Sequence, residues 1–430
     1  MKKLGKIRMM ACPLLCMVGM SAFGQKAYSL EECHAMAFQS NVRVRNAAND
    51  VEAARQERKE AFTKYFPTVS ATGTAFNADK GLLRMDMGPG ARMSLAKSGI
   101  LGGIAATQPL FAGGQIVNAN RLAKVGEEVS RLRREQSDNE VELAVEQYYW
   151  QVVTLKEKRA TLLSLKDMLG RLRGDVELAV GAGVRNRNDL LQVQLRENDV
   201  ESSLVSMESA LSLGRMVLAQ YIGHEGEEAD VADTVDISGG APPFPGDLRR
   251  DHESSLPLTP EYRLLQSEVR AETLQRRLAV GRNMPTVAIG AGYMYDDLMG
   301  HSHTFGVAFA TVSVPLSGWW GGSHSIRRRE LQLRNAENRL ADSSERLMIR
   351  MQKAWDDVQD AYRQMLIARE SIGQAAENLR LNEDYYRAGT TTMSDLLDAQ
   401  AMYRQSRDRY VEAYAQFRIR TVEYRQATGR

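Results

Sequence analysis

The chain has 430 residues, of which 26% are charged and 43% hydrophobic, with 56 basic and 54 acidic side chains. A mean hydropathy of −0.38 excludes a protein with many transmembrane helices, because each helix would need about 20 predominantly apolar residues. The nearly balanced charge argues against a strongly basic protein that binds nucleic acid or another polyanion.

The first 24 residues have the pattern of a cleaved secretory signal: a basic start, a short apolar middle, and small residues just before a cut at Gln25. A lipid anchor on Cys16 is the alternative, although Leu15 stands where a small residue is usual. Either interpretation exports the chain. Removing the segment changes the formal charge from +2 to −2 and leaves Cys33 as the remaining cysteine, so we expect no intramolecular disulfide.

The exported part is predicted to be two copies of one structural plan. Three landmarks recur at one offset of 206 positions, which chance alone does not readily produce. They are Pro109 and Pro315, Gly183 and Gly389, and Asp189 and Asp395. We assign residues 25–222 to the first repeat and residues 259–430 to the second. Residues 223–258, rich in proline, glycine and aspartate, are expected to link them.

Each repeat is expected to begin with a helix and to contribute two strands, at residues 68–76 and 100–110 and at residues 286–295 and about 305–309. About 9 to 12 residues suffice for a tilted strand to cross a bilayer. Four strands cannot close a barrel, because the smallest membrane barrels need about eight. If the strands lie in lipid, the protein must therefore be an oligomer.

Aromatic side chains fall where the predicted strands meet the predicted helices. They are Tyr65, Phe66, Phe111, Trp319 and Trp320. Such a belt is typical of a membrane interface. The alternative is that they are ordinary hydrophobic caps on a soluble sheet. In the membrane interpretation, the loops at residues 81–90 and 296–303 are hairpin tips that face outside.

Two long helices are predicted, from residue 115 to about 180 and from residue 323 to about 387. At 1.5 Å per residue each would be about 100 Å long, too long for one compact domain. Apolar residues along residues 347–379 alternate steps of four and three, an average of 3.5 that is typical of coiled coils.

A glycine-containing turn is expected to end each long helix, after which a second helix returns. Gly183 and Gly389 are predicted to adopt left-handed backbone at these hairpin tips. Asn188 and Ser394 are candidate N-caps of the returning helices, with an aspartate beside each in the first turn.

Two stretches stand out within the duplicated plan: Pro-Leu-Phe-Ala-Gly-Gly at residues 109–114 and, above all, residues 386–400, Tyr-Arg-Ala-Gly-Thr-Thr-Thr-Met-Ser-Asp-Leu-Leu-Asp-Ala-Gln. In the duplicated plan and in these two stretches the chain resembles the TolC-like outer-membrane efflux proteins, along nearly its whole exported length. The resemblance implies an α+β membrane protein in which antiparallel helical hairpins form a periplasmic coiled-coil tunnel. It also implies that four strands from each subunit of a homotrimer form a twelve-stranded barrel in outer-membrane lipid.

The resemblance implies entrance residues at the hairpin tips: carboxylates at Asp395 and Asp398, a tyrosine at Tyr386, and Asp189 at the equivalent place in the first repeat. Some family members have a clamping arginine two residues after the glycine, where this chain has Thr391. A threefold ring of aspartates would favour cations. The alternatives are that Asp395 and Asp189 cap helices and that Asp398 is solvated.

No catalytic constellation, cofactor motif or metal site is predicted. His301 and His303 are two potential metal ligands without a third. The run Arg327-Arg328-Arg329 could contact anionic lipid or form a solvated face.

The sequence therefore predicts a passive outer-membrane duct that docks its hairpin tips onto a periplasmic adaptor and an inner-membrane transporter, serving efflux or type I secretion. The alternative is an exported soluble coiled-coil scaffold without a pore.

Overall fold

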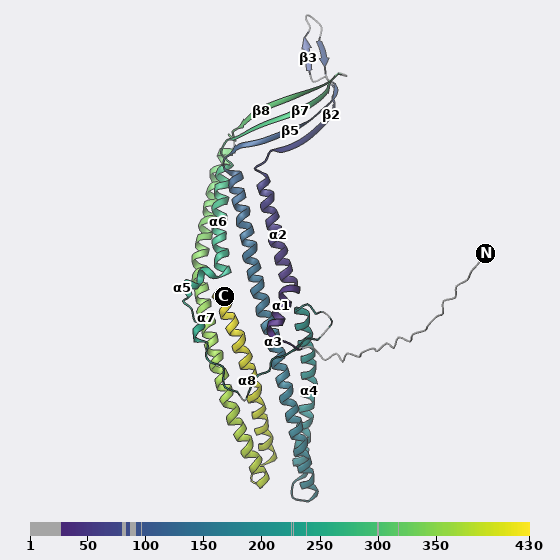
Figure 1. Cartoon of the computed structure of the whole chain (residues 1–430), viewed down its shortest axis with the longest axis vertical. Helices are drawn as coiled ribbons and strands as arrows, with labels where there is room; N and C mark the ends of the chain where they lie inside the picture. The colour runs from purple at the N-terminus through teal and green to yellow at the C-terminus, as the bar shows by residue number, and fades with distance from the viewer. Residues whose placement is uncertain are drawn as a thin grey trace, which may run out of the picture.

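The computed structural model is elongated, with a β-sheet at one end and helical hairpins that extend from it to two adjacent tips (Figure 1). It describes residues 27–79, 83–86, 92–95, 97–224, 226, 228–237, 239–298, 301–316 and 318–430. The predicted signal sequence lies outside these residues, as do most residues of the expected loop 81–90.

In the first repeat, helices α1 (Leu30–Ser40) and α2 (Val42–Thr63) lead towards the sheet. Helix α3 (Gln115–Gly181) then runs for 67 residues from the sheet to the tip, and α4 (Arg187–Tyr221) returns beside it. The predicted long helix, about 100 Å in length, is confirmed.

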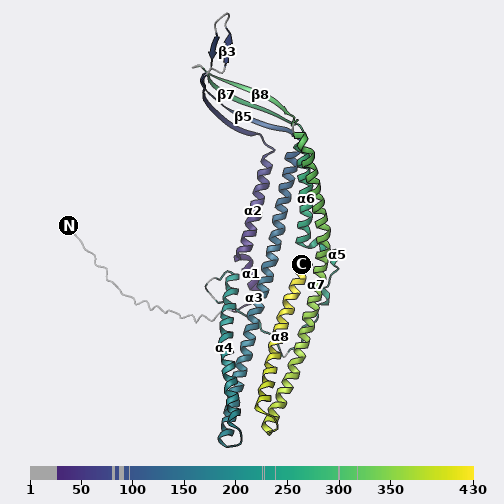
Figure 2. The same cartoon turned by 180° about the vertical axis from the view of Figure 1, so that it is seen from behind.

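The second repeat follows the same plan with α6 (Pro260–Gly281), the 71-residue α7 (Gly318–Ala388) and the returning α8 (Met393–Ala427). Helix α7 begins five residues before the predicted start, so Trp319 and Trp320 lie in its first turn. The views from the two sides show both hairpins running alongside each other (Figure 2).

Four antiparallel strands form the main sheet in the order β2 (Thr68–Asn77), β5 (Ser98–Ala112), β7 (Thr286–Leu298) and β8 (His301–Ser313). The two repeats meet where β5 pairs with β7, and the pairing shifts register between Pro109 and Phe111. Proline has no backbone N–H to donate, so a bulge is a suitable place for it. Strands β2 and β8 are the outer strands of the sheet.

One face of this sheet carries a continuous apolar surface. Ala71 lies opposite Ile104, Ile104 opposite Tyr293, and Tyr293 opposite Gly306, so all four share one face. Ile104 is 58% exposed and Tyr293 is 61% exposed. Large apolar side chains left open in this way identify a surface that needs a partner or lipid.

The other face is mixed. It carries the serine and threonine side chains of β2, together with Phe305, Val307 and Phe309 of β8. Phe309 lies opposite Gly290, and a Cβ atom at that glycine would stand 2.3 Å from the phenyl ring. Gly290 thus leaves room for the ring of Phe309.

Two smaller sheets were not predicted. Strand β3 (Leu83–Asp86) lies in the expected loop 81–90 and pairs with β4 (Arg92–Leu95) just after it, and each strand is too short to show a periodic signal. The parallel pair β1 (Ala27–Tyr28) and β6 (Asp230–Val231) joins the start of the described chain to the segment between the repeats.

That inter-repeat segment is packed against the helices. Ala229, Val231 and Val235 are buried in a core cluster that includes Tyr149 and Trp355. Three short helices, η1 (Gly246–Leu248), α5 (His252–Ser255) and η2 (Leu256–Leu258), complete it. The same cluster encloses Cys33, and burial raises the pKa of its thiol to about 12.

Candidate functional site at the hairpin tips

Gly183 and Gly389 turn the chain at the two tips. Their φ angles are 73° and 77°, which confirms the predicted left-handed backbone. No atom lies within 4 Å of a Cβ built at either position, so the backbone conformation rather than crowding is the reason for glycine.

The N-caps of the returning helices differ from the prediction. Asn186, not Asn188, caps α4 by accepting a hydrogen bond from the backbone N–H of Asn188. Thr392, not Ser394, caps α8 by accepting one from the N–H of Asp395. Each helix begins earlier than predicted because a side chain nearer the glycine can reach its free amides.

Asp395 completes the cap of its own helix. Its Oδ2 accepts hydrogen bonds from the hydroxyl of Thr392 at 2.6 Å, the backbone N–H of Thr392 at 3.1 Å and the hydroxyl of Thr391 at 3.0 Å. These donors, the Thr392 hydroxyl first, hold the pKa of Asp395 below its usual range. Thr391 therefore supports the turn of its own hairpin.

Tyr386 and Asp189 meet between the two hairpins. The Tyr386 hydroxyl donates to Asp189 Oδ2 at 3.4 Å, and the ring is buried. Burial and the Asp189 carboxylate raise the pKa of the Tyr386 phenol, which therefore remains a donor at neutral pH. The resemblance implied that both residues lie at the entrance, and the structure brings their side chains into contact.

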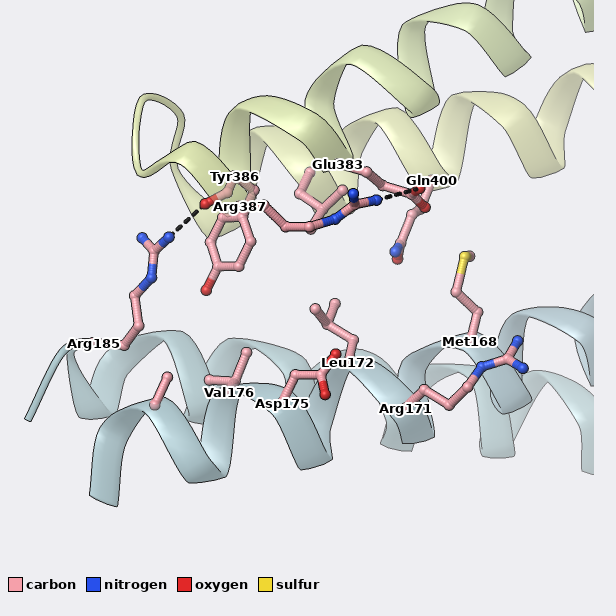
Figure 3. Close-up of a pocket in the computed structure, with 12 residues that line it drawn as sticks. Met168, Arg171, Leu172, Asp175, Val176, Arg185, Glu383, Tyr386, Arg387 and Gln400 are labelled. Carbon is pink, nitrogen blue, oxygen red and sulfur yellow. Dashed lines mark hydrogen bonds and ion pairs between the residues drawn. The ribbon is translucent and has the colours of Figure 1, made fainter. Parts of the chain in front are cut away.

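Arg185 forms a second connection to the same tyrosine. Its guanidinium carbon lies 4.3 Å from the centre of the Tyr386 ring, and its Nη2 donates to the Tyr386 carbonyl oxygen. Figure 3 shows Arg185 reaching from the α3–α4 turn to α7. The cation–π contact and the hydrogen bond attach one hairpin tip to the other.

A cavity of about 530 Å³ lies behind this contact, between α3 and the α7–α8 hairpin (Figure 3). Gln400 faces it with a side-chain oxygen that has no hydrogen-bond partner within the described residues. Leu172, Val176 and Leu396 supply apolar lining. The two hairpins are thus joined at the tip but are incompletely packed just behind it.

Asp398 lies elsewhere. It is exposed in a shallow groove between α4 and α8, whose lining includes Arg196 and Ser394. Within one chain, Tyr386 contacts Asp189, whereas Asp395 accepts hydrogen bonds from its own turn and Asp398 lines the groove between α4 and α8.

Sequence reasoning missed Arg185, although a signal was present. Arg185 precedes Thr391 by the same 206 positions that relate the repeats. A cation two residues after the tip glycine is thus present in the first repeat and absent from the second.

The aromatic residues predicted to form a belt do lie where the sheet meets the helices. Tyr65, Phe66 and Phe111 are 40%, 56% and 48% exposed, and Trp320 is 83% exposed. The Trp319 side chain lies outside the described part of the structure. None of the described helices has both the length and the apolar character needed to span a membrane.

The profile of the outer membrane efflux protein family matches residues 35–224 and 259–430. The two matched segments correspond to the two structural repeats. None of the curated protein sequences matches the chain.

Several solved structures share the fold. CusC has 14% identity and a TM-score of 0.79, covering 94% of this chain and 92% of its own. The outer membrane protein VceC from Vibrio cholerae has 14% identity and a TM-score of 0.76, covering 93% and 96%. The Campylobacter jejuni CmeC outer membrane channel has 12% identity and a TM-score of 0.78, covering 93% and 85%.

Proposed function

Because the chain belongs to the outer membrane efflux protein family, we propose that it forms a passive homotrimeric channel of a tripartite efflux or type I secretion system. The family places it in the outer membrane, with its helices extending into the periplasm, and its members are channel proteins rather than enzymes. Substrates would enter at the hairpin tips and leave through the sheet end.

The sheet carries this proposal. It has four strands, an exposed apolar face, and two outer strands, β2 and β8, that each present one edge. An exposed sheet edge is a template for pairing with another chain. Pairing β8 of one copy with β2 of the next in three copies closes twelve strands, which is within the range of membrane barrels.

The tips are the proposed entrance and the docking surface for a periplasmic adaptor, which connects the channel to an inner-membrane transporter. They lie at the opposite end from the sheet (Figure 1), so docking at Gly183 and Gly389 leaves the membrane part undisturbed. In a trimer Asp395 and Asp398 become rings of like charge that favour cations. The contacts from Tyr386 to Asp189 and Arg185 would hold the closed state.

Fractionation and crosslinking test this function. The full-length protein should be recovered in the outer membrane as a trimer that dissociates on heating. Cysteines placed next to Gly183 and Gly389 should crosslink to an adaptor protein in intact cells, whereas a cysteine in the β3–β4 hairpin should not. A soluble elongated monomer would instead support the scaffold alternative.

A further inference from the structure

The ends of the helices next to the sheet are strongly basic. Residues 58–66, 115–126, 276–283 and 318–329 together contain eleven lysines and arginines and one acidic residue, Glu60. The whole chain has nearly equal numbers of basic and acidic residues. The ends of these helices lie directly below the strands in both views (Figures 1 and 2), so positive charge is concentrated in one band next to the sheet.

The band is present in both repeats. Phe66-Pro67-Thr68-Val69 and Met284-Pro285-Thr286-Val287 align the two copies at an offset of 218, which places Arg58 on Arg276 and Lys59 on Arg277. The offset of 206 places Arg121 on Arg327. In each repeat, both helices that reach the sheet thus carry lysine or arginine side chains near their sheet ends.

A pocket of about 800 Å³ lies between α2 and α3, partly within this band and partly beyond it on the side away from the sheet, where Glu127 and Arg131 line it. Glu127 at its wall is buried and is held by Arg58 and Arg131, which lower the pKa of its carboxyl through their hydrogen bonds, Arg58 first. The one carboxylate offsets the charge of only one of these two arginines, so the three side chains together remain positively charged.

Three further cations of the pocket are exposed and have no ion pair within the described residues. They are Lys59, Arg121 and Lys124. A cluster of unpaired cations around a concave surface attracts a doubly or singly charged anion.

Aromatic rings stand on the sheet side of these cations. Phe62 and Tyr65 line the same pocket, with their ring centres 5.5 Å apart, and are 55% and 40% exposed. Exposed aromatic rings beside lysine and arginine suit the layer of lipid headgroups, where a ring meets acyl chains and a cation meets phosphate. Rings exposed only to water would gain no such contact with acyl chains.

We propose that the pocket between α2 and α3 binds the phosphate-bearing headgroup of an anionic phospholipid in the membrane leaflet nearest the helices. The phosphate would contact Arg121, Lys124 and Lys59, and the start of the acyl chains would lie against Phe62 and Tyr65. The inference depends on the membrane placement of the sheet in the proposed function. The proposed site goes beyond the channel function, because a channel can conduct without preferring anionic lipids.

Native mass spectrometry of the full-length protein in detergent, titrated with phosphatidylglycerol or phosphatidylcholine, tests this site. The wild type should retain phosphatidylglycerol in preference to phosphatidylcholine. Replacing Arg121→Gln and Lys124→Gln should weaken that retention about 10- to 30-fold, since each cation near an anionic surface contributes a factor of about five. The exchange Arg121→Lys with Lys124→Arg should retain it.

The control removes two other exposed arginines that are distant from the sheet, by Arg187→Gln with Arg409→Gln, and should leave lipid retention unchanged. Equal retention of both lipids, or equal loss in the control, would overturn the site. So would binding of inorganic phosphate that the Arg121 and Lys124 variants abolish without any effect on lipid.

These results are separable from a failure of the proposed function. If the variants still form conducting trimers in planar bilayers but retain lipid as the wild type does, the lipid site is wrong and the channel stands. If the wild type is a soluble monomer, the channel itself is wrong.

Discussion

The guanidinium of Arg185 lies over the ring of Tyr386, 4.3 Å from its centre, and joins the tips of the two hairpins of one chain. The same tyrosine donates its hydroxyl to Asp189 at 3.4 Å. Tyr386 is thus the point at which the two repeats meet at the proposed entrance. The contact is made of few atoms, as the proposed closed entrance would need if it is to open.

Arg185→Ala should loosen the entrance. The substitution removes a cation–π contact and a charged hydrogen bond, which together stabilise the joined tips by about 1–2 kcal/mol in a partly exposed setting. Open-channel events in planar-bilayer recordings should increase by roughly 5- to 30-fold. Tyr386→Phe should have a smaller effect, because its hydroxyl contact is long.

Arg187→Ala is the matched control for this prediction. Arg187 is exposed two residues further on, and its side chain forms no hydrogen bond or ion pair within the described residues. Equal gains from Arg185→Ala and Arg187→Ala would show that loss of charge at the tip, rather than the contact with Tyr386, opens the channel.

The first turn of α8 should be sensitive to acid. The pKa of Asp395 is lower in the folded chain than in the unfolded chain, where such a carboxyl titrates near about 4. The ionised Asp395 carboxylate stabilises the first turn fully at pH values above its unfolded-state pKa. This stabilisation is lost as the pH falls through its folded-state pKa. Hydrogen exchange at the first turn, corrected for the intrinsic rate, should therefore accelerate only below about pH 4.

Helix α4 provides an internal control, because its cap Asn186 does not titrate. Asp395→Ala should reproduce the acid effect at neutral pH. If the first turns of α4 and α8 loosened together on acidification, the cause would be general acid unfolding and not the cap.

Asp395→Ala combined with Asp398→Ala should lower the preference for cations. Both carboxylates are exposed at the tip, and three copies of each would otherwise concentrate cations at the entrance. Reversal potentials measured across a salt gradient should shift towards those of an unselective pore. Asp342→Ala with Asp360→Ala removes two exposed carboxylates elsewhere on α7 and should leave selectivity as it was. Unchanged selectivity in the tip variant would remove both residues from the entrance.

Two buried tryptophans should respond differently to replacement by phenylalanine. Trp150 Nε1 donates to Glu146 at 2.9 Å, and both side chains are buried. Trp150→Phe would leave that carboxylate without this donor, at a cost of about 1–3 kcal/mol. Trp355 Nε1 is buried without a partner in the described part of the chain, so Trp355→Phe loses less. Thermal unfolding of the two variants should rank Trp150→Phe as the less stable, and the reverse order would refute this reasoning.

The long helices and the four main strands could be predicted because their signals extend over many residues. The 3.5-residue spacing of apolar side chains in α7 and the glycine at each tip left few structures other than two long helical hairpins. The N-caps were misplaced by two residues because Asn186 and Asn188, like Thr392 and Ser394, have similar intrinsic capping preferences. The structure decides between the two candidates at each tip, because it shows at which residue the chain leaves the turn and the helix begins.

The contacts between elements could not be predicted in the same way. Asp189 and Tyr386 were both expected at the entrance, but they are 197 positions apart in sequence, and their contact depends on how the two hairpins lie together. Arg185 was missed because the expected cation was sought at Thr391 and not at its counterpart in the first repeat. The packed segment between the repeats resembled a linker because its buried residues, such as Val231 and Val235, are few and scattered.

The most direct test of the account is a cryo-electron microscopy structure of the full-length protein in lipid nanodiscs. Three copies should surround one water-filled bore, with β8 of each copy hydrogen-bonded to β2 of the next and Tyr293 facing the lipid. A single copy whose β2 and β8 edges remain unpaired, or pair with each other, would contradict it.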